Sequence, residues 1–101
     1  MSHAQLMAEL KQTMPKMAAG YRTLKDTLRA DSALDAKTKS LTALAIAVSR
    51  RSEETSRLAL DQALAAGATR SEVTEAIGMA VFMGGEPAAF DGDKVFEAYT
   101  D

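Results

Sequence analysis

This 101-residue chain almost entirely lacks cysteine and histidine, two residue types on which much enzymatic chemistry depends. The sequence contains no cysteine and a single histidine, His3. Without cysteine there is no disulfide, no thiolate nucleophile and no sulfur ligand for a metal. Because His3 lies at a terminus that is expected to fray, neither a histidine metal site nor a nucleophile activated by histidine is expected. We therefore predict no metal and no cofactor.

The remaining candidates for acid–base chemistry are charged residues in the middle of the chain. The stretch SRRSEETSRLALDQALAAGAT, residues 49–69, contains Glu53, Glu54 and Arg57. A carboxylate that acts as a general acid or base would have to point inward and have a raised pKa. At the start of a helix, however, Glu53 and Glu54 complement the helix dipole, and Arg57 is expected to be a salt-bridge partner within the helix. The interpretation as surface residues of a helix is favoured.

Helices must position these residues, because apolar residues recur with helical spacing along nearly the whole chain and nothing alternates as a half-buried strand would. The predicted class is all-α, a compact bundle of five to six helices in a single domain covering residues 1–101. A last helix is expected from Pro87, with a kink or break at Asp91-Gly92-Asp93. The other predicted helices cover residues 4–14, 16–29, 36–50, 52–67 and 69–84.

The helix predicted at residues 36–50 is expected to lie at the centre of the bundle. Leu44 and Val48 belong to its inner stripe, and Ala43 and Ile46 make its other sides apolar as well. A helix that is apolar on nearly every side is buried between its neighbours. We therefore expect little of this helix to reach the surface.

Local signals also mark helix ends. Asp35 is a good N-cap, because its carboxylate can accept hydrogen bonds from the first backbone N–H groups of a helix. Gly67 can adopt the left-handed conformation that closes a helix, and Thr69-x-x-Glu72 is the pattern of a capping box. Because the helix-closing Gly67 is followed two residues later by the start of the capping box, the sequence predicts a short connection between two helices.

The composition and charge of the chain indicate which kinds of partner to expect. Hydrophobic residues make up 47% of the chain but aromatic residues only 5%, so small side chains must do most of the packing. Such a protein often gains further burial from contacts between subunits, and we expect a homo-oligomer. The net charge of −2, with scattered basic residues, argues against nucleic acid as a partner. No apolar run could span a bilayer, so no membrane partner is expected and residence in the cytoplasm is predicted.

Two stretches resemble a known family. ALDAKTKSLTALAIAV and QALAAGATRSEVTEAIGMAVFMGGEPA are similar to the core of the alkylhydroperoxidase-D-like and carboxymuconolactone decarboxylase family, over about residues 34–97. The resemblance implies an alkylhydroperoxidase-D-like fold and assembly in a multiple of three subunits, as a trimer or hexamer. The most specific matching pieces are Gly67-Ala68-Thr69 with Glu72, Glu75 and Ala76, then Met83-Gly84-Gly85 and Pro87.

The same resemblance points to a reactive site whose groups are replaced. Peroxidases of the family carry a Cys-x-x-Cys pair, a histidine four residues later, and a glutamate on the preceding helix. On this sequence the cysteine positions are Ser52 and Thr55, the histidine position is Ala59, and the glutamate position is Ser40. With spacing i, i+3 and i+7, the first three are expected to face the central helix, with Ser52 as a plain N-cap and Thr55 as a small core-facing residue. Because a hydroxyl cannot form a disulfide, thiol redox catalysis is excluded.

Three hypotheses follow. The first is a redox-silent member of the family that acts as an oligomeric helical module, either a natural paralogue kept for binding or assembly or an engineered scaffold whose thiols were replaced. The second is a thiol-independent small-molecule enzyme of the carboxymuconolactone decarboxylase type that uses Glu53, Glu54 or Arg57. That branch of the family also lacks the cysteine pair, but it carries a histidine near the position of Ala59. The third is a module that binds peptides or nucleic acid, for which the sequence offers neither a basic patch nor a groove signature. None of the three supplies a small-molecule ligand.

Overall fold

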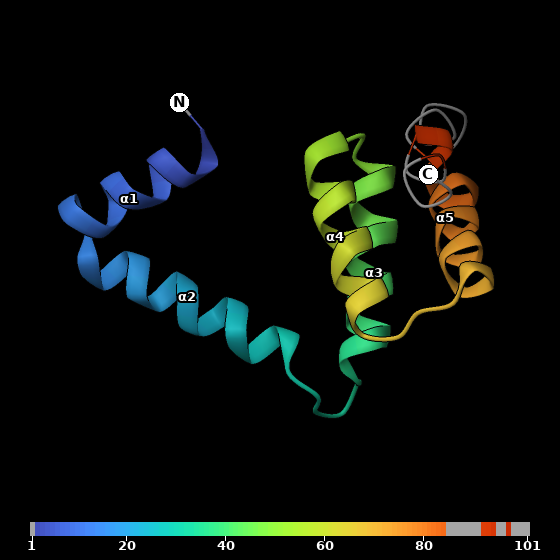
Figure 1. The fold of residues 1–101 in the computed structure, drawn as a ribbon, viewed down its shortest axis with the longest axis horizontal. Coiled ribbons are helices and arrows are strands. Elements are labelled where there is room, and N and C mark those ends of the chain that lie inside the picture. Colours follow the sequence, from blue (N-terminus) through green and yellow to red (C-terminus); the bar gives the residue numbers. More distant parts are fainter. Residues whose placement is uncertain (1, 85–91, 95–96, 98–101) are drawn as a thin grey trace. The chain divides into compact units, whose positions relative to one another are not determined.

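The computed structural model describes residues 2–84, 92–94 and 97, and all regular secondary structure in these residues is helical. The predicted all-α class is therefore confirmed. By its internal contacts the chain divides into two units, Met1–Ala30 and Asp31–Asp101, while the expectation of one domain over the whole chain stays a prediction. The helices are α1 (His3–Thr13), α2 (Pro15–Arg29), α3 (Ala36–Ser49), α4 (Glu53–Ala65) and α5 (Arg70–Gly84) (Figure 1).

The first unit is a hairpin of α1 and α2. A capping box opens α1: the Gln5 N–H donates to Ser2 Oγ, and the Ser2 N–H donates to Gln5 Oε1. The backbone of His3 is thus the first turn of a capped helix, and the expectation of a frayed terminus is wrong at this residue. Met14 separates the two helices, and Pro15 begins α2 one residue before the predicted start, because proline fits the first helical position but cannot continue the preceding helix.

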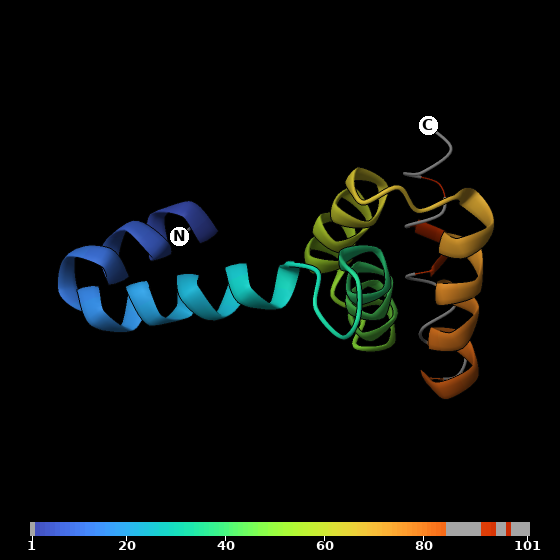
Figure 2. The same ribbon diagram turned by 90° about the horizontal axis from the view of Figure 1, so that it is seen from below.

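The hairpin has no core of its own. The two helices run side by side (Figure 2), yet none of the side chains described in this unit is buried. The large apolar residues of α2, which are Met17, Tyr21, Leu24 and Leu28, are all exposed. Two helices enclose too little space to remove such side chains from water.

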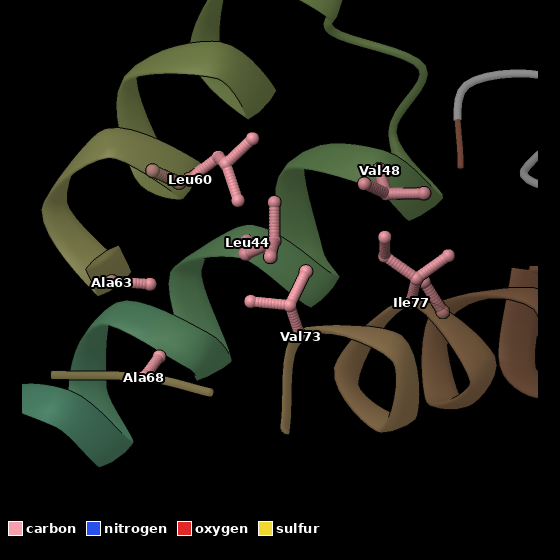
Figure 3. Close-up of a cluster of buried hydrophobic side chains, with 9 residues drawn as sticks. Leu44, Val48, Leu60, Ala63, Ala68, Val73 and Ile77 are labelled. Atoms are coloured by element: carbon pink, nitrogen blue, oxygen red, sulfur yellow. The ribbon is translucent and has the colours of Figure 1, made fainter. Parts of the chain in front are cut away.

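The second unit has the core. Its α3 contacts both α4 and α5, which confirms that α3 is the central helix of this unit. Leu44 and Val48 are fully buried on α3, and Val73 from α5 is fully buried against the same cluster (Figure 3). The buried members of the cluster are Leu44, Val48, Ala59, Leu60, Ala63, Ala68, Val73, Ile77 and Ala80.

One side of α3 remains exposed, which differs from the prediction. Ala43 and Ile46 lie in contact with solvent, and Thr42 beside them is exposed as well. The reason is that, among the described residues of the second unit, α4 and α5 cover two sides of α3 and leave the third side open. The apolar residues on that side therefore indicate a surface that another chain could cover.

The α4–α5 connection follows the predicted pattern. Gly67 has φ of 92°, its N–H donates to the Leu64 carbonyl at 3.0 Å, and the Ala68 N–H donates to the Ala63 carbonyl at 2.9 Å. This pair of bonds is the Schellman motif, which satisfies the last carbonyl groups of a helix. A side chain at Gly67 would be strained in this left-handed conformation.

Two of the three predicted N-caps, Asp35 and Thr69, are confirmed. Asp35 Oδ1 accepts a hydrogen bond from the Thr38 N–H at 2.7 Å at the start of α3. At the start of α5, the Thr69 N–H donates to Glu72 Oε1 at 2.8 Å and the Glu72 N–H donates to Thr69 Oγ1 at 3.1 Å. The capping box that the sequence predicts is therefore formed in full.

The predicted last helix lies largely outside the described residues. Pro87 and Asp91 are not among them, so the predicted kink cannot be placed. Residues 92–94 are helical, and Gly92 is buried where a side chain would come within 2.6 Å of Ile77 Cγ2. Glycine allows this close approach to the core.

Candidate functional site

The α3–α4 connection positions the residues that match the family's reactive groups. It has the same hydrogen bonds as the end of α4: the Arg51 N–H donates to the Val48 carbonyl and the Ser52 N–H donates to the Ala47 carbonyl, both at 3.0 Å. Here, however, the left-handed residue is Arg51, with φ of 58°, rather than a glycine. An arginine in this conformation is strained, because its Cβ approaches the backbone.

Ser52 occupies the N-cap position of α4 but does not cap the helix with its side chain. Its backbone is extended, and its hydroxyl accepts no hydrogen bond from the first turn. The predicted position is confirmed and the predicted capping role is wrong. Glu53 and Glu54 in the first turn complement the helix dipole instead, as the sequence predicts.

The buried face of α4 differs by one residue from the predicted one. Ala59 is 4% exposed and belongs to the core, but Thr55 is exposed, so the prediction that Thr55 faces the core is wrong. The buried residue of that turn is Ser56, which is 0% exposed. The reason is helical geometry: a buried stripe that continues to Ala59 and Ala63 passes through position 56, three residues before Ala59.

The structure therefore separates the four replaced positions. Ser52 is half-buried at the start of α4, Ala59 is in the core, and Thr55 points to solvent. Ser40 lies on α3 and is half-buried. What remains of the site is a small hydroxyl at the helix start and a methyl group in the core, neither of which can take up or deliver a proton near neutral pH.

Ser56 is a residue that the sequence analysis missed. Its hydroxyl oxygen is buried and has no hydrogen-bond partner. A buried hydroxyl without a partner destabilises a fold by roughly 1–3 kcal/mol. The signal was present in the sequence, since the stripe formed by Ala59, Leu60 and Ala63 fixes position 56 on the inner face.

The candidate acid–base residues lie on the surface. Glu53 forms ion pairs with Arg57, four residues later, at 3.5 Å and with Lys94 at 3.6 Å, and all three side chains are about half exposed or more. Glu54 is exposed as well. The predicted role of Arg57 as a helical salt-bridge partner is confirmed. The alternative enzyme hypothesis requires a carboxylate that points into the core, and neither Glu53 nor Glu54 does so.

A groove between α3 and α5 is the second feature that the sequence analysis missed. Its volume is about 420 Å³, and its walls come from both helices. At one end Lys37 Nζ lies 2.8 Å from Glu72 Oε2. Its lining residues are Thr38, Leu41, Thr42, Ala45, Glu72, Glu75, Ala76 and Met79.

The Lys37–Glu72 pair dominates the electrostatics of that end of the groove. The hydrogen bond from Lys37, followed by the backbone hydrogen bond at Thr69, lowers the pKa of Glu72 below its usual range. The same contact raises the pKa of Lys37. Both groups are therefore charged near neutral pH, and the pair ties the start of α3 to the start of α5.

Residues 2–84, 92–94 and 97 contain no group of three or more histidine, cysteine or acidic residues that could hold a metal ion. Within the same residues, no helix is long and apolar enough to cross a membrane.

Comparisons with known proteins agree on one family. A model of the carboxymuconolactone decarboxylase family matches residues 15–98, so the match includes α2 and begins earlier than the predicted core at residue 34. A carboxymuconolactone decarboxylase family protein from Legionella pneumophila has a similar crystal structure, with 32% identity, a TM-score of 0.83, and coverage of 97% of this chain and 90% of that one.

A second similar structure supports the fold alone. It is a candidate carboxymuconolactone decarboxylase from Burkholderia xenovorans, with 20% identity, a TM-score of 0.82, and coverage of 96% of this chain and 75% of that one. No curated protein matches the chain. From the matched residues and the similarity to the Legionella protein, the chain belongs to the carboxymuconolactone decarboxylase family.

Proposed function

We propose that this chain is a redox-silent member of its family that functions as a self-associating helical module. The proposal rests on the residue found at the position where peroxidases of the family have their histidine. Ala59 stands there, 4% exposed and packed in the apolar core, in a sequence without any cysteine. The chain thus has no thiol to oxidise and no imidazole to activate one.

The described buried residues where α3 meets α4 are mostly apolar. Leu44 from α3 and Leu60 from α4 meet there, and Ala63 extends the same apolar contact (Figure 3). A reactive site would need a polar group on this inner surface, and the one such group, the Ser56 hydroxyl, has no base beside it as a partner. The packing supports a structural role for this helix pair.

Self-association is supported by the apolar residues that remain exposed. None of the described side chains of the α1–α2 hairpin is buried, Ile46 is exposed on α3, and Phe82 and Met83 are exposed on α5. Burial of such residues between subunits would add the apolar contact that a chain with few aromatic residues lacks. We expect an assembly in a multiple of three. Light scattering at micromolar concentration tests this expectation, and a stable monomer would contradict it.

Restoring the reactive groups tests redox silence. The unmodified protein should show no thiol-dependent reduction of peroxide. Ser52→Cys with Thr55→Cys should form a disulfide, because the two positions lie one turn apart and the N-cap backbone is not fixed in a helical conformation. Adding Ser40→Glu and Ala59→His should lower the pKa of the thiols and produce peroxide reduction.

The disulfide is the cleaner measurement, because Ala59→His forces an imidazole into the core and is expected to destabilise the fold. Glu54→Cys with Arg57→Cys is the matched control: both positions are exposed and one turn apart, but both lie inside α4, where the helical backbone makes the disulfide strained. If the first pair resists oxidation while circular dichroism shows an intact fold, this helix does not correspond to the family's redox helix.

A further inference from the structure

The hairpin of α1 and α2 has an apolar stripe that nothing in its own unit covers. Met17, Tyr21, Leu24 and Leu28 follow one another at intervals of four, three and four residues, so they share one face of α2. All four are exposed, Leu24 by 56%. A hairpin of this length cannot enclose a core, so its stability depends on another surface that covers this stripe.

The groove between α3 and α5 has the complementary character. Leu41, Ala45 and Ala76 form an apolar floor, and Met79 at one end is 56% exposed. Glu75 lines the groove and is exposed. The groove therefore offers apolar contact with an acidic edge.

The groove matches the later part of the stripe in length. The whole stripe, Met17 to Leu28, covers eleven residue steps, and its part from Tyr21 to Leu28 covers seven. The two walls of the groove, Thr38 to Ala45 and Glu72 to Met79, also cover seven steps each. With a rise of 1.5 Å per residue, each seven-step distance is about 10 Å. Tyr21, Leu24 and Leu28 stand at i, i+3 and i+7, which is the spacing with which a helix anchors in an apolar groove.

The charges of the two units are also complementary. Residues 1–30 contain five basic and two acidic residues, a net charge of +3. Since the whole chain carries −2, residues 31–101 carry −5. Lys25 flanks the stripe, four residues after Tyr21 and three before Leu28. Opposite charges of this kind favour encounter between the two surfaces and disfavour contact between two stripes or two grooves.

We propose that the α2 stripe of one copy docks into the α3–α5 groove of a second copy. The proposal rests on the self-association in the proposed function and names the surfaces that produce it. A second copy is the occupant because its groove fits the Tyr21–Leu28 part of the stripe in length and the two units have opposite net charge. Since the two surfaces differ, the contact is heterologous, and an assembly in a multiple of three requires that successive contacts close into a ring.

Three matched variants test the docking. Leu24→Glu places a charge in the stripe, Met79→Lys places one in the groove, and Leu58→Glu places one on α4, outside both surfaces. The three residues are exposed to a similar degree, 56%, 56% and 52%, so all three variants should keep their helical content by circular dichroism. Sedimentation velocity should show Leu24→Glu and Met79→Lys as monomers and Leu58→Glu as the wild-type assembly.

Mixing the two defective variants gives the decisive measurement. The Leu24→Glu copy retains its groove and the Met79→Lys copy retains its stripe, so an equimolar mixture has one intact contact for each pair of copies. Native mass spectrometry should detect a heterodimer and nothing larger. A second pair, Lys25→Glu and Glu75→Lys, should each weaken the assembly alone and restore it when combined in one chain.

Contradicting outcomes separate this docking from the proposed function. The docking is wrong if the wild type assembles but the mixture stays monomeric, or if Leu24→Glu leaves the assembly intact. In either case self-association would use another surface. If the wild type is a monomer, self-association itself fails. Binding of the wild type to vesicles with anionic lipid, lost in Leu24→Glu while the assembly persists, would assign the stripe to a membrane surface and overturn the docking.

Discussion

The two connections that flank α4 share one backbone motif and differ in almost everything else. At the α4–α5 connection the left-handed residue is Gly67, and the Thr69–Glu72 capping box gives hydrogen-bond partners to backbone N–H groups at the start of α5. At the α3–α4 connection the left-handed residue is Arg51, and the hydroxyl of Ser52 caps nothing. One turn later, the buried Ser56 hydroxyl has no partner.

The difference shows where local sequence and structure disagree. Every local choice at the second connection favours the observed backbone, whereas the first connection keeps strain and an unsatisfied polar group. These disfavoured features, at Arg51 and Ser56, lie next to Ser52 and Thr55, the positions where related peroxidases have their cysteines. Strain of this kind concentrates at functional sites, and here the frame persists without the groups that would use it.

Core packing should outweigh every change at either connection. Leu44 is fully buried where α3 meets the rest of the second unit, so Leu44→Ala should destabilise the protein by about 2–5 kcal/mol through lost burial and a residual cavity. Urea denaturation monitored by circular dichroism gives the value. A smaller loss than that caused by Gly67→Ala would mean that α3 is not the core helix.

Removing the orphan hydroxyl should stabilise the first connection. Ser56→Ala deletes a buried group without a partner and introduces a better helix former, so the free energy of unfolding should rise by about 1 kcal/mol. Ser71→Ala, at an exposed position of α5, is the control for helix propensity alone. A stability loss in Ser56→Ala would show that the hydroxyl has a partner in solution.

The caps of the two helices should respond unequally. Thr69→Ala removes the oxygen that accepts the Glu72 N–H and should cost about 1 kcal/mol. Ser52→Ala removes a hydroxyl that caps nothing and should change stability by less than about 0.5 kcal/mol. Thermal unfolding of both variants under one condition tests this, and equal losses would remove the distinction between the connections.

Much of the fold could be predicted because its signals are local. Helical spacing, Pro15, the Asp35 cap and the capping box at Thr69 each act within a few residues, and the structure has all of them. The exposed side of α3 could not be predicted in the same way. An apolar residue such as Ile46 looks the same in a sequence whether its own chain or another chain covers it.

The candidate site was harder to predict for a physical reason. The family motif aligns residues by their spacing along the chain, but the side that faces the core is fixed by packing. A shift of one position rotates a side chain by about 100° around the helix, which moves the buried role from Thr55 to Ser56. The groove between α3 and α5 depends on two helices meeting, so its lining is not visible in either segment alone.

The two left-handed residues should respond in opposite directions. Gly67→Ala adds a strained Cβ and should cost about 1 kcal/mol, although no neighbouring atom lies within 4 Å of that position. Arg51→Gly relieves strain at φ of 58° and should gain up to about 1 kcal/mol, less the entropy that glycine adds to the unfolded chain. Chemical denaturation of both variants gives the two signs, and a loss in Arg51→Gly would mean that the Arg51 side chain stabilises the connection in another way.

The smallest expected effect is the pH dependence of the second connection. Because the pKa of Glu72 is lowered in the folded chain, chiefly by the hydrogen bond from Lys37, the unfolded chain binds a proton more readily than the folded one in acid. The contribution of Glu72 to stability is therefore present above its ordinary pKa of about 4.3 and is lost as the pH falls through the lower, folded value. Lys37, whose pKa is raised, contributes to stability below its ordinary pKa of about 10.4 and loses that contribution as the pH rises through the folded value.

The melting temperature of the wild type should thus exceed that of Glu72→Gln near neutral pH, and the difference should shrink below about pH 4. Asp35, whose pKa its hydrogen bond with Thr38 lowers, keeps its own acid sensitivity in both proteins, so only the difference between them reports on Glu72. Asp61→Asn, at an exposed carboxylate of α4 outside this ion pair, is the control. A difference that stays constant from pH 7 to pH 3 would show that Glu72 stabilises the connection without its charge.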